Sequence, residues 1–202
     1  GVTEDAGDDG FENNAVVWSP DGEIVDGFTK VRRVPFGEYV PLRGLLDDLV
    51  DLSVLPRDAV AGDGDGTVDT PTGRFAVAIS YEVFFSDRAR SGVRAGGEVL
   101  LVPTNASSYT TSQVPTQEVA AAQLRAWETG RWVLQAAPTG YSAVIDERGE
   151  VLQRSVLGER ELLHASVPRR SGDTVYVRLG DAPLLAVALA MIAAGRLRGW
   201  RR

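Results

Sequence analysis

Short runs of β-forming residues alternate with helix-forming runs along the middle of the chain, and this alternation restricts the fold more than any other feature. Residues 74–79 and 98–103 are apolar and typical of strands, and residues 87–95 between them are typical of a helix. Residues 116–129 are rich in helix formers and lead into a further strand-like run at 132–136. Each helical run ends at a glycine, as helices commonly do. The pattern predicts helices packed on a sheet that contains parallel strands.

Two hairpins accompany this alternating region. Residues 14–18 and 23–29 flank a Ser-Pro-Asp-Gly sequence, in which proline fixes φ and glycine accepts a positive φ. Residues 142–145 and 151–155 flank a second turn that also ends in glycine. Because hairpins are antiparallel, we expect an α/β layered fold with a mixed sheet.

The two ends of the chain differ from its middle. Residues 1–10 are acidic and glycine-rich, without the basic and apolar regions of a signal peptide, and we interpret the chain as a piece of a longer protein. Residues 182–194 form an uncharged apolar run of 13 residues, shorter than the roughly 18 to 20 that a membrane span needs. By length this run favours a buried or interfacial helix, whereas the arginines that follow it suit a cytoplasmic flank. We therefore divide the chain into a domain at 1–181 and an apolar helix at 182–202.

Composition excludes several classes of function. The formal net charge is −7, and nucleic-acid binding needs a basic surface, so we expect no nucleic-acid partner. The chain has no cysteine, which removes disulfides, cysteine zinc sites and a thiol nucleophile. It has one histidine, which is too few for a multi-histidine metal site and leaves a single candidate for a Ser-His-Asp triad.

The first candidate site follows the first hairpin. Lys30 is followed by the sequence Val-Pro-Phe-Gly-Glu-Tyr-Val-Pro at 34–41, in which two prolines and a glycine restrict a loop that carries Glu38. Rigid loops of this kind often hold functional side chains. Taken alone, lysine and glutamate residues such as these are more often solvated surface charges than site residues.

Two further candidates come where predicted strands end. Ser80, Tyr81 and Glu82 follow the strand at 74–79, and a polar loop that includes Asn105 follows the strand at 98–103. Open α/β sheets place reactive groups at such strand ends. The alternative interpretation is a serine that makes a local backbone hydrogen bond, followed by an ordinary polar loop.

Together these segments resemble the nitrilase-like domain of bacterial apolipoprotein N-acyltransferases over nearly the whole chain. The resemblance rests on the motifs K-x-x-x-V-P-F-G-E-Y-V-P (30–41), S-Y-E (80–82), P-T-N-A-S (103–107), R-A-W-E-T-G-R (125–131) and A-P-T-G-Y-S-A-V-I-D (137–146). It implies a nitrilase-like αββα sandwich on the outer face of the bacterial cytoplasmic membrane, with several membrane helices before the domain and one after it. On this basis we expect residues 182–202 to begin or form a transmembrane helix with a basic cytoplasmic tail.

The resemblance also implies a chemistry. In the family a cysteine attacks a phospholipid acyl ester, and the acyl group then passes to the diacylglyceryl-modified N-terminal cysteine of a lipoprotein, without a cofactor or metal. Lys30 matches the lysine that stabilises the oxyanion, Glu38 matches a second important glutamate, and Glu82 matches the carboxylate two places after the nucleophile. We expect Tyr81 and Asn105 to contact substrate. The family's general-base glutamate lies upstream of the lysine motif, before the first residue of this sequence.

Two departures from the family pattern affect the expected activity. Ser80 stands at the nucleophilic cysteine, and Ala-Ser-Ser-Tyr at 106–109 stands where many members have Asp-Ala-Trp-Phe. A serine hydroxyl is far less acidic than a thiol and normally needs a basic partner. Three functions therefore stay open: a membrane-anchored N-acyltransferase that uses Ser80 or is impaired by it, a soluble carbon-nitrogen hydrolase acting on a small amide, and a relative that only binds lipid or lipoprotein. All catalytic readings require Ser80, Lys30 and Glu38 to share one pocket.

Overall fold

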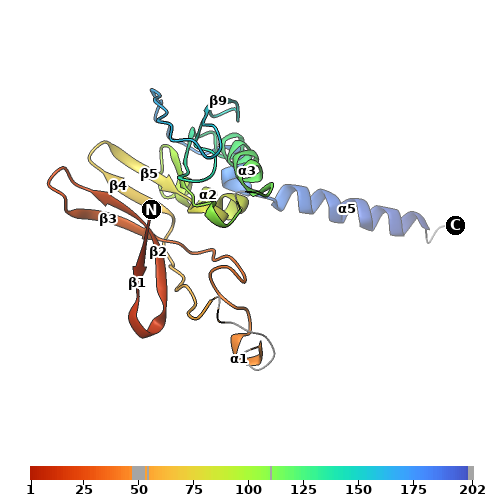
Figure 1. Cartoon of the computed structure of the whole chain (residues 1–202). Helices are drawn as coiled ribbons and strands as arrows, with labels where there is room; N and C mark the ends of the chain where they lie inside the picture. The colour runs from red at the N-terminus through yellow and green to blue at the C-terminus, as the bar shows by residue number, and fades with distance from the viewer. Residues whose placement is uncertain (47–52, 54, 110, 200–202) are drawn as a thin grey trace.

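The protein is built on two β-sheets that pack against each other (Figure 1). The computed structural model describes residues 1–46, 53, 55–109 and 111–199. One sheet is antiparallel, in the order β1-β2-β3, and consists of β1 (Val2–Asp5), β2 (Phe11–Trp18) and β3 (Ile24–Thr29).

The second sheet has six strands in the sequence order of the chain. Its members are β4 (Thr67–Thr70), β5 (Gly73–Val77), β6 (Leu100–Pro103), β7 (Val133–Ala136), β8 (Ala143–Ile145) and β9 (Val151–Arg154). The central strands β5, β6 and β7 run parallel, whereas β4, β8 and β9 pair antiparallel with their neighbours. Because parallel strands end at the same edge, the segments after β5 and β6 come out side by side.

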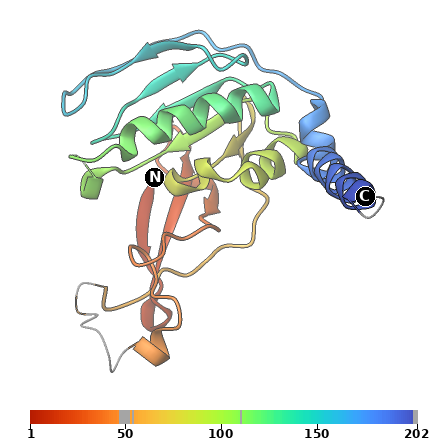
Figure 2. The same cartoon turned by 90° about the vertical axis from the view of Figure 1, so that its right-hand side faces the viewer.

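Helices connect the parallel strands and cover one face of the six-stranded sheet (Figure 2). Helix α2 (Ser86–Arg94) joins β5 to β6, and helix α3 (Val114–Thr129) joins β6 to β7. The left-handed Gly130 ends α3 at a φ of 64°. Shorter helical segments lie elsewhere: η1 (Gly7–Asp9), α1 (Arg43–Leu46), η2 (Ser80–Phe84), η3 (Ser107–Tyr109) and α4 (Val175–Leu179).

Two hydrophobic clusters hold these layers together. The larger lies between the helices and the six-stranded sheet and includes Leu100, Val119 and Ala126. The smaller joins the two sheets, with Phe28 of β3 packed among apolar residues of β4 and β5. Apolar surface is buried on both faces of the six-stranded sheet, which explains why the sequences of its central strands are continuously apolar.

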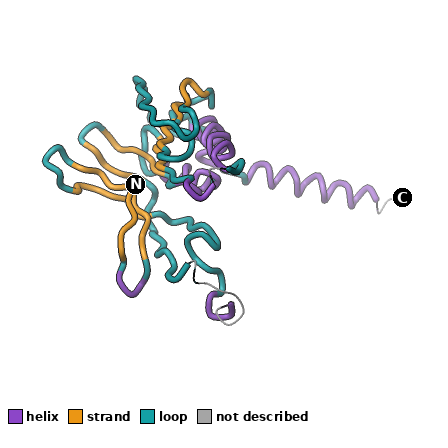
Figure 3. The backbone as a smooth tube through the Cα atoms, viewed as in Figure 1, coloured by secondary structure: helices purple, strands orange, loops and turns teal. Residues whose placement is uncertain are grey.

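The predicted α/β architecture with a mixed sheet is confirmed. Both predicted helices, both hairpins and the strands of the alternating region form (Figure 3). Their ends lie within two residues of the expectation, except that β2 begins at Phe11, three residues early. Strands β1 and β4 and helices α1 and α4 had no counterpart among the predicted elements. In the described residues the helical layer lies on the six-stranded sheet, and the three-stranded sheet carries no such layer.

The C-terminal segment forms helix α5 (Ala182–Gly199), which extends away from the sheets (Figure 1). Its apolar side chains are exposed, among them Leu184, Leu185 and Leu189. The interpretation of this run as a buried core helix is therefore wrong. The transmembrane helix expected here is not found either, because no helix in the described residues is both long and apolar enough to cross a membrane.

Candidate active site

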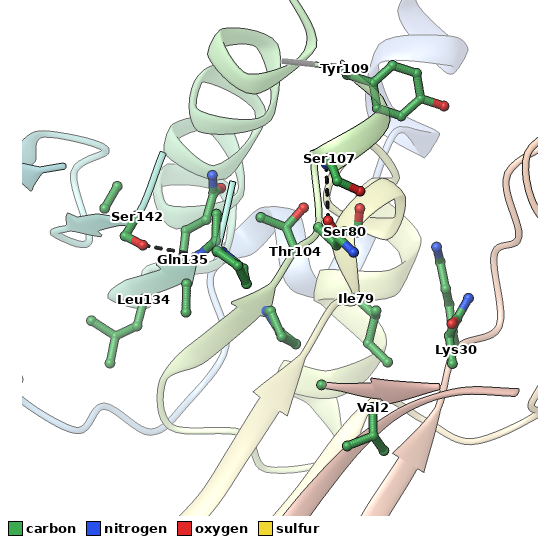
Figure 4. A pocket seen from close by; sticks show the side chains of 18 of the residues that line it. Val2, Lys30, Ile79, Ser80, Thr104, Ser107, Tyr109, Leu134, Gln135 and Ser142 are labelled. Carbon is green, nitrogen blue, oxygen red and sulfur yellow. Dashed lines mark hydrogen bonds between the residues drawn. The ribbon is translucent and has the colours of Figure 1, made fainter. Parts of the chain in front are cut away.

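A pocket of about 870 Å³ opens where the two sheets meet. The three-stranded sheet and the segment after it contribute Asn13, Lys30 and Glu38, and the strand ends of the six-stranded sheet contribute Ser80 and Asn105. Figure 4 shows Lys30 and Ser80 in this pocket. The pocket thus collects residues from segments far apart in the sequence, such as Asn13 and Asn105, which are 92 positions apart. Its apolar lining comes from both sheets and from the segment after β9, and includes Val2, Val34, Ile79, Leu134, Leu162 and Leu163.

Lys30 and Glu38 form a buried ion pair at one side of this pocket. The Lys30 ammonium nitrogen lies 2.6 Å from Glu38 Oε1, and the Lys30 residue is only 2% exposed. Asn13 donates to the same Glu38 oxygen at 2.8 Å, and the backbone N–H of Val34 donates to Oε2 at 2.7 Å. Both carboxylate oxygens of Glu38 are therefore occupied, and Glu38 holds the lysine charge in a fixed place.

The loop at 34–41 folds back on itself to present Glu38. The Val34 carbonyl accepts hydrogen bonds from the backbone N–H groups of Gly37, Glu38 and Tyr39. This closed turn requires a φ of 59° at Phe36, which non-glycine residues seldom adopt. Prolines on either side restrict the chain further, as the sequence indicated.

Ser80 lies on a sharp turn between β5 and α2. Its φ is 50°, in the left-handed region that side chains other than glycine rarely occupy. A strained residue at a strand end is a common way to present a nucleophile above a sheet. The Ser80 hydroxyl is partly exposed to the pocket and donates a hydrogen bond of 3.3 Å to Glu118 Oε1.

Glu118 is a buried carboxylate that the sequence analysis did not single out. It lies on α3, is 3% exposed and also accepts a hydrogen bond of 2.8 Å from the Thr104 hydroxyl. Burial raises the pKa of the Glu118 carboxyl, while the hydrogen bonds from Thr104 and Ser80 and the charge of Lys30 oppose that rise. Among the described residues, its second oxygen, Oε2, has no hydrogen-bond partner.

Glu82 and Tyr81 lie outside the pocket lining, in contrast to the roles expected for them. Glu82 is fully buried and accepts hydrogen bonds from the backbone N–H groups of Val31, Arg32 and Ile79. These bonds tie the backbone after Lys30 to the turn that carries Ser80. The Tyr81 and Phe85 rings pack edge to face with their centroids 5.0 Å apart, so Tyr81 packs within the turn and not in the pocket.

Asn105, which we expected to contact substrate, lines the pocket. Its side-chain oxygen accepts hydrogen bonds from the Ser107 backbone N–H at 3.0 Å and from the Thr139 hydroxyl at 3.3 Å. These bonds join the loop after β6 to the loop after β7. The Asn105 amide nitrogen is the part of the side chain that these two contacts leave for a substrate carbonyl.

The arrangement provides the three elements that acyl transfer needs. Ser80 supplies a hydroxyl, Glu118 a carboxylate that touches it, and Lys30 a positive charge in the same pocket. A developing oxyanion is stabilised by such a preplaced charge, and a hydroxyl is activated by a base within hydrogen-bond reach.

Comparison with known sequences gives a consistent result. The profile of the carbon-nitrogen hydrolase family matches residues 1–175. A protein of Nostoc named apolipoprotein N-acyltransferase is 38% identical over 178 residues, which are 87% of this chain and 35% of that protein. A Synechocystis protein of the same name is 36% identical over 86% of this chain and 33% of its own length. The chain therefore spans about one third of the length of these relatives.

Solved structures show the same fold at lower sequence identity. Nit3 of Saccharomyces cerevisiae, a member of the nitrilase superfamily, superposes with a TM-score of 0.59 at 23% identity, over 78% of this chain and 54% of that one. A carbon-nitrogen hydrolase of Helicobacter pylori gives a TM-score of 0.56 at 18% identity, over 76% of this chain and 56% of that one. The predicted nitrilase-like α/β fold is therefore confirmed.

Proposed function

This chain belongs to the carbon-nitrogen hydrolase family, and from that membership and its pocket we propose that it is the catalytic part of a bacterial lipoprotein N-acyltransferase. In the proposed reaction an acyl chain moves from a phospholipid ester to the α-amino group of a diacylglyceryl-modified N-terminal cysteine. The observation that most strongly supports this proposal is that Ser80, Lys30 and Glu38 line one pocket. They do so in a chain that is 38% identical to a protein named for this activity.

Each of the three residues has a distinct role in this proposal. Ser80 attacks the ester carbonyl and carries the acyl group as an oxyester. Lys30 stabilises the oxyanion of both tetrahedral intermediates by its charge, and Glu38 holds Lys30 in position through the 2.6 Å ion pair. No cofactor or metal takes part in this sequence of steps.

The dimensions and lining of the pocket support a lipid substrate. A volume of about 870 Å³ lies within the range of small-molecule sites, and apolar residues from both sheets line it beside the polar groups. Apolar surface of this kind suits an acyl chain, while Asn105 and Lys30 suit the polar ester.

We place the working protein at the outer face of the cytoplasmic membrane, because both proposed substrates are held there by acyl chains. The exposed apolar side chains of α5, including Leu184, Leu189 and Ile192, support contact of this helix with lipid. Soluble proteins rarely leave so continuous an apolar surface uncovered.

The direct test uses the full-length protein in detergent with phospholipid and a diacylglyceryl-modified peptide. We expect the wild-type protein to gain the mass of one acyl chain at the peptide that contains Ser80, and the acceptor to become N-acylated. The Ser80→Ala variant should do neither. Hydrolysis of short amides without acyl transfer would instead favour an amidase, and lipid binding without either reaction would favour a binding protein.

A further inference from the structure

Helix α5 joins the domain through α4, the short helix directly before it. Val177 of α4 is fully buried in the larger hydrophobic cluster, together with residues of α2, α3 and the six-stranded sheet. The large apolar side chains of α5, by contrast, are exposed, and the helix extends away from the sheets (Figure 1). The contacts of α4 therefore decide how α5 is held relative to the pocket.

Arg90 of α2 holds the C-terminal end of α4. Its guanidinium donates to the Val177 carbonyl at 3.1 Å and lies 5.5 Å from the centre of the Tyr176 ring, a cation–π contact. It also lies against Gly180, which ends α4 at a φ of 59° and donates its N–H to the Tyr176 carbonyl at 2.7 Å. A Cβ at position 180 would collide with the Arg90 guanidinium, so the close approach of Arg90 requires glycine there.

Tyr176 extends this connection to the first turn of α5. Its hydroxyl donates to Asp181 Oδ1 at 2.8 Å, and Asp181 directly precedes α5. The Asp181 carbonyl in turn accepts the Leu185 N–H at 3.0 Å, a bond of the first turn of α5. Tyr176 thus contacts α2 through its ring and the beginning of α5 through its hydroxyl.

The other end of α4 is connected to the turn that carries Ser80. Thr174, which caps α4, donates its hydroxyl to the Glu128 carbonyl of α3 at 2.6 Å. Arg125, one turn earlier on α3, forms a buried ion pair with Glu128 at 2.9 Å and donates to the Phe84 carbonyl at 3.4 Å. Phe84 is the last residue of η2, and Ser80 is the first. Hydrogen bonds and buried side chains therefore connect α5 to the Ser80 turn.

We propose that Arg90 and Tyr176 are positioning residues for acyl transfer, because they fix the direction of α5 relative to the Ser80 turn. This inference rests on the proposed function, in which α5 contacts lipid and Ser80 takes the acyl group. A helix bound at a membrane has a set depth and orientation, so a rigid connection gives the pocket a set orientation as well. With a loose connection the domain would swing on α5, and a phospholipid ester would reach Ser80 less often.

The test compares two forms of phospholipid, with the full-length protein and an Arg90→Gln, Tyr176→Phe double variant. Phospholipid in vesicles reaches the pocket only from the membrane, whereas a short-chain phospholipid dissolved as monomers reaches it from any direction. The readout is the acyl mass gained by the peptide that contains Ser80. We expect acylation of the double variant from vesicles to fall on the order of 10-fold or more. Its acylation by monomers and its co-flotation with vesicles should stay at the wild-type level.

Arg154→Gln is the matched control. Arg154 lies 4.7 Å from the centre of the Tyr141 ring, so it makes the same kind of contact on β9, away from α4 and α5. This variant should be acylated at the wild-type rate from both forms of phospholipid. An equal fall of the double variant with both forms would mean that Arg90 and Tyr176 only support the fold, and would overturn the proposal. Wild-type acylation of the double variant from vesicles would overturn it too.

A distance measurement separates this inference from the proposed function. Trp127 on α3 and Ile192 on α5 are both exposed, so spin labels on cysteines introduced at these positions report the direction of α5 without any reaction. Cysteines elsewhere in the full-length protein are replaced by serine. We expect a narrow distance distribution in the wild-type background and a broad one in the double variant, and equal widths would overturn the connection. Broadening in a protein that takes no acyl chain from either phospholipid would support the connection and reject the N-acyltransferase.

Discussion

Glu82 Oε1 accepts the backbone N–H of Val31 at 2.9 Å across 51 positions of sequence. The same carboxylate accepts Ile79 N–H through its other oxygen, so a single side chain joins the backbone next to Lys30 to the backbone next to Ser80. The distance between the proposed cation and the proposed nucleophile therefore depends on a residue that lines neither side of the pocket.

Glu82→Gln should weaken this connection. One carboxylate oxygen is replaced by an amide NH₂ that cannot accept a backbone donor, and an unsatisfied buried donor costs about 1 to 3 kcal/mol. We expect the free energy of unfolding in urea to fall by this amount, and acyl transfer to fall further than stability alone explains. Wild-type acyl transfer in a folded Glu82→Gln protein would show that Glu82 does not set the site geometry.

Lys30→Met should remove the proposed oxyanion stabilisation. Removing one such group usually costs about 100-fold to 1,000-fold in kcat. Because Glu38 would be left partly buried without its cation, Lys30→Met with Glu38→Gln is the cleaner comparison, and it should be equally inactive but more stable. Recovery of activity in the double variant would contradict the role of Lys30, and stability is followed by thermal unfolding.

The raised pKa of the buried Glu118 carboxyl predicts a gain in stability when its charge is removed. A carboxyl whose folded pKa is raised contributes stability below its unfolded pKa, and this contribution is lost as the pH rises through the folded value. Glu118→Gln should therefore unfold at higher urea concentration than wild type at pH 7, and the difference should close as the pH falls toward 4. A variant that is less stable than wild type at pH 7 would contradict the raised pKa.

Helix α5 should govern attachment to lipid. Leu184 is 70% and Leu189 is 66% exposed, so replacing both with Asp leaves the packing of the domain intact. We expect this double variant to lose co-flotation with phospholipid vesicles while its thermal unfolding stays unchanged. Leu152→Asp on the exposed face of β9 is the control, and equal flotation of all three proteins would remove α5 from the membrane contact.

Local patterns of residues in the sequence predicted most of the fold but not all of it. Helices α2 and α3 and both hairpins carry periodicity or turn residues within their own sequence, so they were predictable. Strand β1 lies in an acidic, glycine-rich segment and exists because Val2 to Asp5 pair with β2, a tertiary contact that no local pattern reveals.

The candidate site was predictable only in part, for a related reason. Lys30, Glu38 and Ser80 stood out through their loops and through resemblance to a family. Glu118 offered one weak signal, a position four residues before the buried Ala122 on the same face of α3. A glutamate in a helix usually faces solvent, so its burial beneath Ser80 had to come from the packing of α3 on η2.

The meeting of the two sheets at the pocket has a consequence for synthesis on the ribosome. Lys30 and Glu38 are synthesised with the end of the three-stranded sheet, whereas Ser80 of the same pocket follows 42 positions after Glu38. The pocket can thus form only after the strand that leads to Ser80 has been made, and a ribosome that stalls before this point releases a fragment without an assembled pocket.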